Sequence, residues 1–162
     1  MTSIQCGYQP GLIGRVTQLH ATFYAQHAGF GQFFESQVAS GLAEFAGRLG
    51  APRNGVWVAM QEEQIVGSVS VDGDAPGDKV ALIRWFIVDP QAQGAGLGRQ
   101  LLSQALQFCD QQGFTCVRLW TFQGLDAARA LYEQHGFVLM EESVGEQWGP
   151  PVVVQRFERV SP

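Results

Sequence analysis

The chain has 162 residues, 46% of them hydrophobic, which is enough for one domain with a buried core, and its composition predicts no disordered segment. The net charge is −5 and the basic residues are dispersed, which argues against a nucleic-acid partner. No apolar run approaches the roughly 20 residues that span a bilayer, and no basic segment followed by an apolar one opens the sequence, so we expect a cytoplasmic protein that does not bind membranes.

Two helices are predicted at the start of the chain. Leu12, Val16, Leu19 and Phe23 recur at helical spacing. After the glycines at 29 and 31 a second series has the same period: Phe34, Val38, Gly41, Leu42, Phe45 and Leu49. The segment 50–55 contains Pro52 and is predicted to end the second helix.

Three strands are predicted next. Residues 56–60 (VWVAM) and 64–71 (QIVGSVSV) are typical of a hairpin that turns at Glu62 and Glu63. Residues 81–88 (ALIRWFIV) form an apolar run broken only by Arg84, and we expect this run to be a central strand of the sheet.

Helices and strands alternate in the second half. The predicted elements are a helix at 96–112, a strand at 116–122, a helix at 126–135 and strands at 137–142 and 152–160. Gly113 is placed to end the first of these helices, and Asp126 is expected to cap the second. The order predicts a mixed α/β fold, with residues 1–162 as a single domain.

The stretch VDPQAQGAGLGRQLL, residues 88–102, has glycines at 94, 96 and 98 between a strand and a helix. A dinucleotide-binding fingerprint would need glycine where Arg99 stands, and the phosphate loop of nucleotide hydrolases would need a Gly-Lys pair, which the chain lacks. Unpaired amides at a helix N-terminus still bind anions, because the helix dipole favours negative charge there. The stretch therefore predicts a site for a phosphorylated carrier.

A metal site is not expected. Asp72, Asp74 and Asp78 cluster in one loop, but a calcium loop that began at Asp72 would need glutamate at its twelfth position, where Ile83 stands. We interpret this loop as a solvated hairpin tip. The three cysteines form no C-x-x-C pair, which is typical of reduced thiols.

Two motifs resemble the GNAT superfamily of N-acetyltransferases, and the resemblance covers nearly the whole chain. The pattern [QR]-x-x-G-x-[GA] is met at Gln93, Gly96 and Gly98. Downstream, ARALYEQHGF (128–137) is similar to the superfamily's A-x-x-L-Y-x-x-x-G-F. More narrowly, the stretches 7–11, 23–35 and 119–121 resemble the acetyltransferase half of bacterial proteins that fuse a MarR-type DNA-binding domain to this fold. The sequence matches that half alone, in agreement with its acidic charge.

The resemblance implies a twisted, mostly antiparallel mixed sheet with splayed central strands flanked by helices, and acetyl-CoA as co-substrate. The pyrophosphate of coenzyme A would bind to the backbone of Gln93, Gly94, Ala95, Gly96, Leu97, Gly98 and Arg99, with Ala128 of the second motif also at the cofactor. Backbone groups of Phe86, Ile87 and Val88 would pair with the pantetheine arm as a neighbouring strand does. Leu125 stands where the superfamily often has asparagine, so one polar contact to the pantetheine is absent or supplied otherwise.

The resemblance also implies direct acetyl transfer to a primary amine of a small molecule or peptide, with Tyr132 as general acid. The acceptor cleft would lie between the first two helices and the central strands, lined by Tyr24, His27, Trp85 and Trp120. Strand alternation predicts Arg84 and Phe86 on one face and Trp85 and Ile87 on the other, which offers no carboxylate as base.

Candidates for the base are His27, Glu35 and Asp89, or an ordered water. The oxyanion would take a backbone N–H near Val88. Because no base is evident, a CoA-binding sensor or a partner-binding module without activity is the alternative function. A homodimer is left open.

Overall fold

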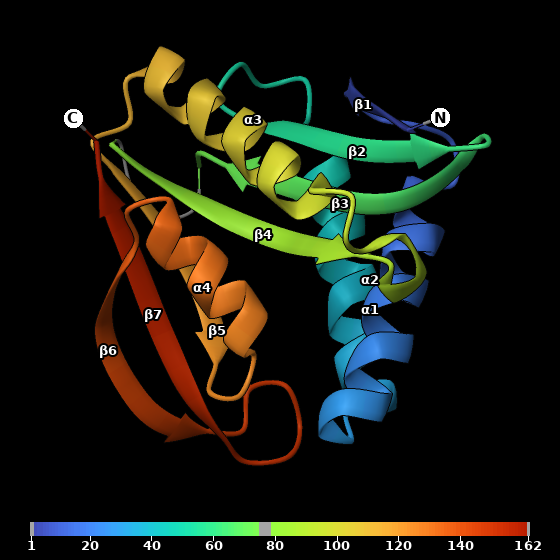
Figure 1. Ribbon diagram of the computed structural model, residues 1–162, viewed down its shortest axis with the longest axis vertical. Coiled ribbons are helices and arrows are strands. Elements are labelled where there is room, and N and C mark those ends of the chain that lie inside the picture. Colours follow the sequence, from blue (N-terminus) through green and yellow to red (C-terminus); the bar gives the residue numbers. More distant parts are fainter. Residues whose placement is uncertain (1, 75–78, 162) are drawn as a thin grey trace.

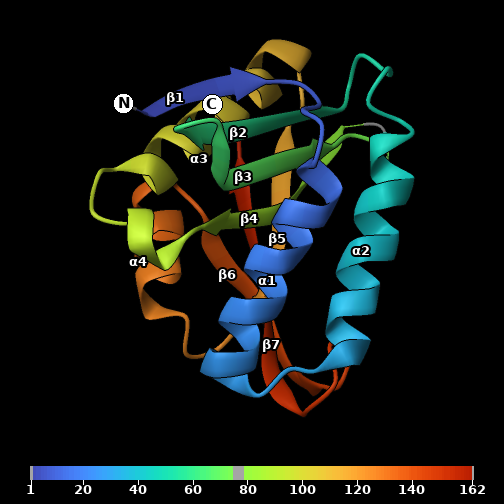
Figure 2. The same ribbon diagram turned by 90° about the vertical axis from the view of Figure 1, so that its right-hand side faces the viewer.

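The computed structural model describes residues 2–74 and 79–161. Its seven described strands form one mixed sheet in the order β1-β2-β3-β4-β5-β7-β6, and every neighbouring pair is antiparallel except β4 and β5, which are parallel. Helices α1 and α2 lie on one side of the sheet, whereas α3 and α4 lie on the other (Figures 1 and 2). The predicted fold class is therefore confirmed.

The first strand, β1 (Thr2–Cys6), was not predicted. It pairs along its whole length with β2 (Gly55–Gln61) at the edge of the sheet. Its sequence, TSIQC, is short and no side chain in it is fully buried, so the hydrophobic pattern is weak. The prediction failed because this strand is stabilised mainly by pairing with β2.

The two predicted N-terminal helices are confirmed. Helix α1 (Leu12–Ala28) ends at Gly29, and α2 (Gln32–Ala46) follows it at once. Helix α2 ends at Ala46 and is shorter than predicted. Leu49 lies in the following turn, where it still packs against the apolar cluster beneath the two helices.

The predicted hairpin and central strand are also confirmed. Strand β2 turns at Glu62 and Glu63, both at positive φ, into β3 (Gln64–Asp72), and β4 (Val80–Val88) pairs with β3. Strand β4 has β3 on one side and β5 on the other, so it is central as expected.

The second half contains α3 (Leu97–Gln112), β5 (Cys116–Phe122), α4 (Asp126–Gln134), β6 (Val138–Gly145) and β7 (Val152–Val160). Gly113 ends α3 in the left-handed conformation, as its position predicted. The prediction that Asp126 caps α4 is wrong, because Asp126 is the first helical residue and Leu125 is the N-cap. An acidic side chain in the first turn still suits the helix dipole.

The core is divided by the sheet. On one side, α3 packs on β2, β3 and β4 through Leu101, Leu102 and Ala105, which are fully buried. On the other side, a second cluster centres on Leu42 and Phe45 of α2. A third cluster, Phe30, Phe34, Val38 and Phe122, joins the far end of the two helices to β5.

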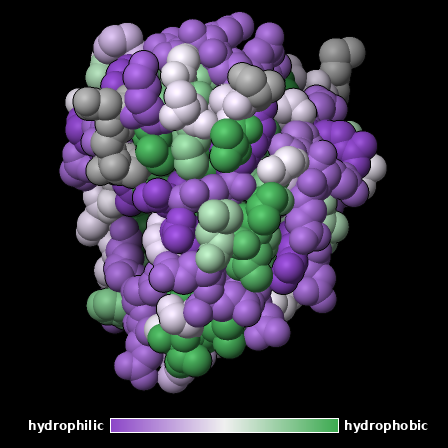
Figure 3. Space-filling model, turned by 90° about the vertical axis from the view of Figure 1, so that its left-hand side faces the viewer, coloured by the Kyte–Doolittle hydropathy of each residue, from purple (hydrophilic) through white to green (hydrophobic). Residues whose placement is uncertain are grey.

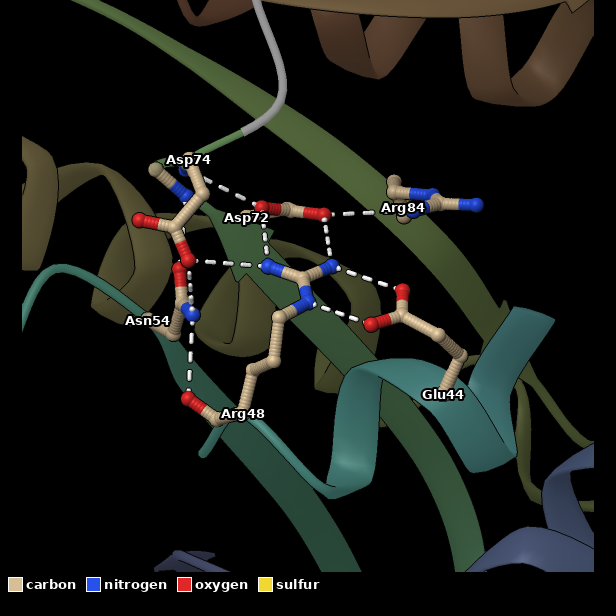
Figure 4. A network of polar contacts seen from close by, with 7 residues as sticks. Glu44, Arg48, Asn54, Asp72, Asp74 and Arg84 are labelled. Carbon is tan, nitrogen blue, oxygen red and sulfur yellow. Dashed lines mark hydrogen bonds and ion pairs between the residues drawn. The ribbon is translucent and has the colours of Figure 1, made fainter. Parts of the chain in front are cut away.

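At the start of the loop after β3, Asp72 is not solvated as the sequence suggested. Asp72 is completely buried and takes hydrogen bonds from Arg48 at 2.8 and 3.1 Å and from Arg84 at 3.2 Å (Figure 4). Arg48 also binds Glu44 and Asp74. We call these residues, with Asn54, the Arg48 network. The third predicted carboxylate, Asp78, lies outside the described residues.

The opposite edge of the sheet, β6, is largely exposed. Its apolar side chains Val138, Met140 and Val144 are each more than half exposed. Glu141 and Glu142 stand between them in the strand. Figure 3 shows this side of the molecule, where apolar patches are interrupted by hydrophilic ones.

Candidate active site

Strands β4 and β5 separate in the middle of the sheet. Their pairing runs from Val80 opposite Cys116 to Ile83 opposite Leu119, and the five remaining residues of β4 have no partner on β5. In a continuous sheet, strands lie about 4.8 Å apart and leave no room for a ligand. The separation opens the sheet and exposes one edge of β4.

A bulge in β4 overturns the predicted alternation of side chains. Ser68 pairs with Ile87 and Ser70 with Arg84, so Trp85 and Phe86 together face the single residue Val69. Trp85 has a φ of 49°, which lets the strand accommodate the extra residue. Arg84 and Trp85 therefore both lie toward α2, whereas Phe86 packs on the α3 side, contrary to the predicted pairing of faces.

A cavity of about 860 Å³ occupies the opening. It extends from α1 and α2 between β4 and β5 to Tyr132 of α4. Much of its wall is aromatic: Tyr24, Phe30, Phe34, Trp85, Phe86, Trp120, Phe122, Tyr132 and Trp148. The loop between β6 and β7 covers one side, where Gln37 donates a hydrogen bond to the carbonyl of Gln147 at 2.8 Å.

The glycine-rich loop leads from the end of β4 into α3. Gly94 and Gly96 have positive φ values of 95° and 74°, which a larger side chain rarely adopts. No acceptor within the described chain takes a hydrogen bond from the amides between Gly94 and Arg99, because the helical pattern begins with the amide of Gln100. Free amides at a helix N-terminus are able to bind an anion.

Side chains around the loop hold it against the open edge of β4. Gln93 donates from Nε2 to the carbonyl of Val88 at 3.2 Å, and Arg99 donates to Gln134 of α4 at 3.2 Å. A Cβ at Gly98 would lie 3.4 Å from Leu131 and 3.6 Å from Phe86. The loop, β4 and α4 thus meet at one point.

The predicted cofactor residues in β4 and α4 lie beside this point. Phe86 and Val88 are partly buried against the α3 core, and Ile87 is buried. Ala128 is partly buried on α4 and packs against the same core.

Tyr132 reaches the cavity from α4. Its ring is buried and lies between the rings of Phe86, Phe137 and Phe157. Its hydroxyl has no hydrogen-bond partner in the part of the chain that the structure describes. Burial, together with the neighbouring Tyr24, raises the pKa of Tyr132 well above its usual value, so the hydroxyl keeps its proton.

Of the predicted acceptor residues, Tyr24, Trp85 and Trp120 line the cavity. His27 does not, because it lies on an exposed part of α1, where its ring stacks on Phe23. The other two base candidates also lie elsewhere. Glu35 borders a separate groove between α1 and α2. Asp89 pairs with Arg15 and accepts a hydrogen bond from the amide of Gln91.

A histidine that the sequence gave no reason to favour lines the cavity. His20 is 6% exposed, and its Nδ1 lies 2.8 Å from the carbonyl of Val16. Burial lowers the pKa of His20 to about 4, against a smaller opposite effect of the Val16 carbonyl, so the ring is neutral near pH 7. Only the helical period could have placed His20 beside Val16 on the buried face of α1.

Two charged side chains also border the cavity, Arg84 and Glu141. The Arg84 guanidinium stacks over the ring of Trp85 at 4.0 Å and binds Asp72. Gly41 of α2 faces this pair, and a Cβ there would lie 3.1 Å from the Trp85 ring.

No cluster of three or more potential metal ligands occurs among residues 2–74 and 79–161. Within the same residues, no helix is long and apolar enough to cross a membrane.

The opened sheet, the free amides at a helix N-terminus and the adjoining tyrosine lie together in the part of the chain where the sequence motifs predicted a carrier site. The family model described as "Acetyltransferase (GNAT) family" matches residues 17–137, and the chain belongs to this family.

Curated relatives agree with this assignment. Mycothiol acetyltransferase of Cellulomonas flavigena is 32% identical over 143 residues, which cover 83% of this chain and 39% of that protein. Human N-acetyltransferase 8B is 33% identical over 95 residues, 57% of this chain and 42% of that protein. The chain thus spans about two fifths of the length of these relatives.

Solved structures share the fold. An N-acetyltransferase from Staphylococcus aureus superposes with a TM-score of 0.81 at 13% identity, over 99% of this chain and 98% of that one. A Salmonella typhimurium protein solved with its cofactor acetyl-CoA gives a TM-score of 0.79 at 16% identity, over 99% and 94% of the two chains. At these identities the likeness concerns the fold.

Proposed function

We propose that this protein is an N-acetyltransferase that moves the acetyl group of acetyl-CoA directly to a primary amine of a small molecule or peptide. One observation carries the proposal: the glycine-rich loop, with its free amides, packs at Gly98 against Phe86 of β4 and Leu131 of α4, and Phe86 and Tyr132 line the opening between β4 and β5. A phosphate group held by the loop would direct the rest of its carrier along the open edge of β4. The relatives' names and the acetyl-CoA of the Salmonella structure support this reading.

The residues of the chain fit the parts of acetyl-CoA. The amides of Gly94 to Arg99 donate to the pyrophosphate, and the helix dipole of α3 adds to the attraction. The amide of Gln93, which the sequence included in this set, already donates to the carbonyl of Pro90 at 3.5 Å. Phe86, Ile87 and Val88 offer backbone groups to the amides of the pantetheine arm. Acetyl-CoA supplies a thioester whose carbonyl carbon is open to attack by an amine.

Tyr132 acts as the general acid. Its hydroxyl stays protonated and donates its proton to the departing sulfur. The backbone N–H near Val88 donates a hydrogen bond to the acetyl carbonyl, where negative charge develops. The aromatic walls around Tyr24, Trp85 and Trp120 exclude water and pack against the body of the acceptor.

The narrower resemblance to the acetyltransferase half of MarR-type fusion proteins belongs to the same proposal. It rests on the stretches 7–11, 23–35 and 119–121. We likewise treat residues 1–162 as one domain, because all described strands join a single sheet.

Turnover of acetyl-CoA tests the proposal. The release of coenzyme A thiol is followed with a panel of polyamines, aminoglycosides, amino acids and peptides with free N-termini. We expect one class to be acetylated, with the product identified by mass spectrometry. Tight binding of acetyl-CoA without turnover of any amine would instead identify a CoA-binding sensor.

A thermal shift experiment tests the carrier separately from the chemistry. A ligand that binds only the folded state stabilises it by about 2.7 kcal/mol at a hundredfold excess over its Kd. The melting temperature should therefore rise with acetyl-CoA and stay constant with NAD or ATP. An equal rise with NAD would contradict the assignment of coenzyme A.

A further inference from the structure

Three residues that line the cavity carry a polar side-chain atom without a partner among residues 2–74 and 79–161: His20 Nε2, Tyr24 Oη and Tyr132 Oη. Within the described residues, the one buried side-chain oxygen or nitrogen that is both sealed from solvent and unpaired is Thr17 Oγ1. The three atoms are unpaired but not sealed, so the cavity reaches them. Unpaired polar atoms on the wall of an aromatic cavity are costly unless a ligand or water binds there.

The three atoms differ in what they can do. Tyr24 and Tyr132 are neighbours whose hydroxyls stay protonated, because burial raises the pKa of Tyr24 to about 12 and that of Tyr132 further. A phenol hydroxyl is foremost a donor at neutral pH. His20 alone among the three presents a nitrogen lone pair.

The geometry of α1 fixes which nitrogen of His20 is free. Nδ1 lies 2.8 Å from the carbonyl of Val16, which can only accept, so Nδ1 carries the proton and Nε2 carries the lone pair. The ring also stacks on Tyr24, with centroids 6.1 Å apart. The hydrogen bond to Val16 thus determines the tautomer of His20, and the contact with Tyr24 helps to fix the orientation of its ring.

We propose that His20 Nε2 is the acceptor for the amine proton in this reaction, the base that the sequence did not reveal. The inference rests on the proposed acetyl transfer and adds a residue to it. The incoming amine donates an N–H hydrogen bond to Nε2, which aims the nitrogen lone pair at the acetyl carbonyl. His20 touches the substrate and is a catalytic residue in that sense.

The proton balance closes within the cavity. As the N–C bond forms, the amine nitrogen becomes acidic and its proton passes to Nε2. As the C–S bond breaks, Tyr132 protonates the sulfur. The imidazolium of His20 then returns a proton to the Tyr132 oxygen. Tyr24 stacks on the His20 ring and acts electrostatically on Tyr132. The products are the amide and the free thiol of coenzyme A.

The neutral state of His20 suits this role. A permanently charged imidazolium could neither accept a hydrogen bond from the amine nor take its proton as the N–C bond forms. Burial keeps His20 neutral, and the other ionisable groups that line its cavity are Tyr24, Arg84, Tyr132 and Glu141. His20 should therefore stay a proton acceptor down to about pH 5, well below the range of an exposed histidine.

His135 provides a matched control. Its Nδ1 lies 2.9 Å from the carbonyl of Leu131 four residues earlier, the same local contact that His20 makes. Its Nε2, however, lies 3.2 Å from Ser103 Oγ, and the residue is not part of the cavity wall. Replacing each histidine by phenylalanine removes the same local hydrogen bond, but only one replacement removes a free acceptor from the cavity.

Kinetics with tryptamine as the probe amine give the first test. His20→Phe should lower kcat/KM for the amine by roughly a hundredfold, the low end for a general base, and leave the Kd of acetyl-CoA within twofold. His135→Phe should leave both unchanged. His20→Gln, which keeps an acceptor oxygen, should recover part of the rate. A His20→Phe variant that folds and acts within threefold of the parent would overturn the proposal.

Nitrogen-15 NMR of the imidazoles gives a second test that needs no turnover. We expect the His20 signals of a neutral ring protonated at Nδ1 to persist to pH 5, and Nε2 to shift when tryptamine is added. A His20 that is charged at pH 6, or protonated at Nε2, would contradict the inference. If the parent acetylated no amine at all, the proposed function would fail, while these spectra would still decide the state of His20.

Discussion

The protein contains two groups of inward-facing polar side chains, and they are built in opposite ways. In the Arg48 network, Arg48 binds three carboxylates, and the side-chain amide of Asn54 both donates and accepts hydrogen bonds (Figure 4). In the cavity, the side-chain atoms of His20, Tyr24 and Tyr132 that face inward have no partner along the described chain. Polar side chains whose hydrogen-bonding atoms all have protein partners hold elements of the fold together. Polar side chains with unpaired atoms can bind a ligand.

The comparison predicts which substitutions change activity and which change stability. Substitutions in the cavity and the glycine-rich loop should alter catalysis or binding with little loss of stability. Substitutions in the Arg48 network should lower stability and leave catalysis and binding nearly unchanged.

The largest effect is expected at Tyr132. Tyr132→Phe removes the hydroxyl and keeps the ring, so kcat should fall roughly ten- to a thousandfold with little change in acetyl-CoA affinity. Because the hydroxyl has no partner among the described residues, the melting temperature should hardly change. Steady-state kinetics and a thermal scan measure both quantities, with Tyr8→Phe at an exposed position as control. An unchanged kcat would make Tyr132 a packing residue.

The Arg48 network should show the opposite response. Arg48→Met leaves the buried Asp72 carboxylate with Arg84 as its remaining cation, which should cost about 3 kcal/mol of unfolding free energy. The Kd of acetyl-CoA should not change. Urea unfolding measures the loss, and Arg129→Met, which breaks a solvent-exposed pair with Glu133, should cost under about 0.5 kcal/mol. Similar losses for the two variants would refute the structural role of the network.

The glycine-rich loop offers a smaller effect on binding. Gly96→Val forces a β-branched residue to a φ of 74°, so the loop should shift and the Kd of acetyl-CoA should rise roughly a hundredfold. Gly113→Val imposes the same strain, at a φ of 80°, on the other end of α3 and should leave the Kd unchanged. Calorimetry compares the two variants. Equal affinities would mean that the loop does not hold the phosphates.

The smallest expected effect is a pH dependence of stability at Asp72. Burial opposes ionisation of this carboxyl, but the Arg48 hydrogen bonds, the amide of Asp74 and the charges of Arg48 and Arg84 outweigh it and lower the pKa. A carboxyl whose pKa is lowered in the folded state stabilises the fold at pH values above its ordinary pKa of about 4. This contribution is lost as the pH falls below that value. Urea midpoints at pH 7 and pH 3 should differ less in Asp72→Asn than in the parent.

The elements with strong hydrophobic periods were predictable from sequence. Strand β5 and strand β7 match their predicted bounds, because both combine buried residues with clear turn signals. Strand β1 was missed because pairing with β2, rather than a hydrophobic pattern, stabilises it. The bulge at Trp85 was missed because a period of two cannot reveal an inserted residue.

The parts of the candidate site that lie within a short sequence motif could be predicted. The parts that are distant in sequence, and that only the fold brings together, could not. The loop at 93–99 and Tyr132 each lie within a short pattern. His20 has no such signal, because it differs from any buried helix residue only through the cavity that β4 and β5 create. The same holds for the Arg48 network, in which Arg48 and Asp72 are 24 residues apart.

Because Gly41 has no side chain, a substitution at this position would change the shape of the proposed acceptor site from outside its wall. Gly41 lies on α2 outside the cavity wall, yet a Cβ there would press on the Trp85 ring at 3.1 Å, and the ring must give way. Since Trp85 is also part of the wall, each methyl added at position 41 reshapes the space for the acceptor without touching a catalytic group. Descendants of this chain, natural or engineered, would thus change the shape of the proposed acceptor space through a helix surface while the residues proposed to hold coenzyme A stay intact.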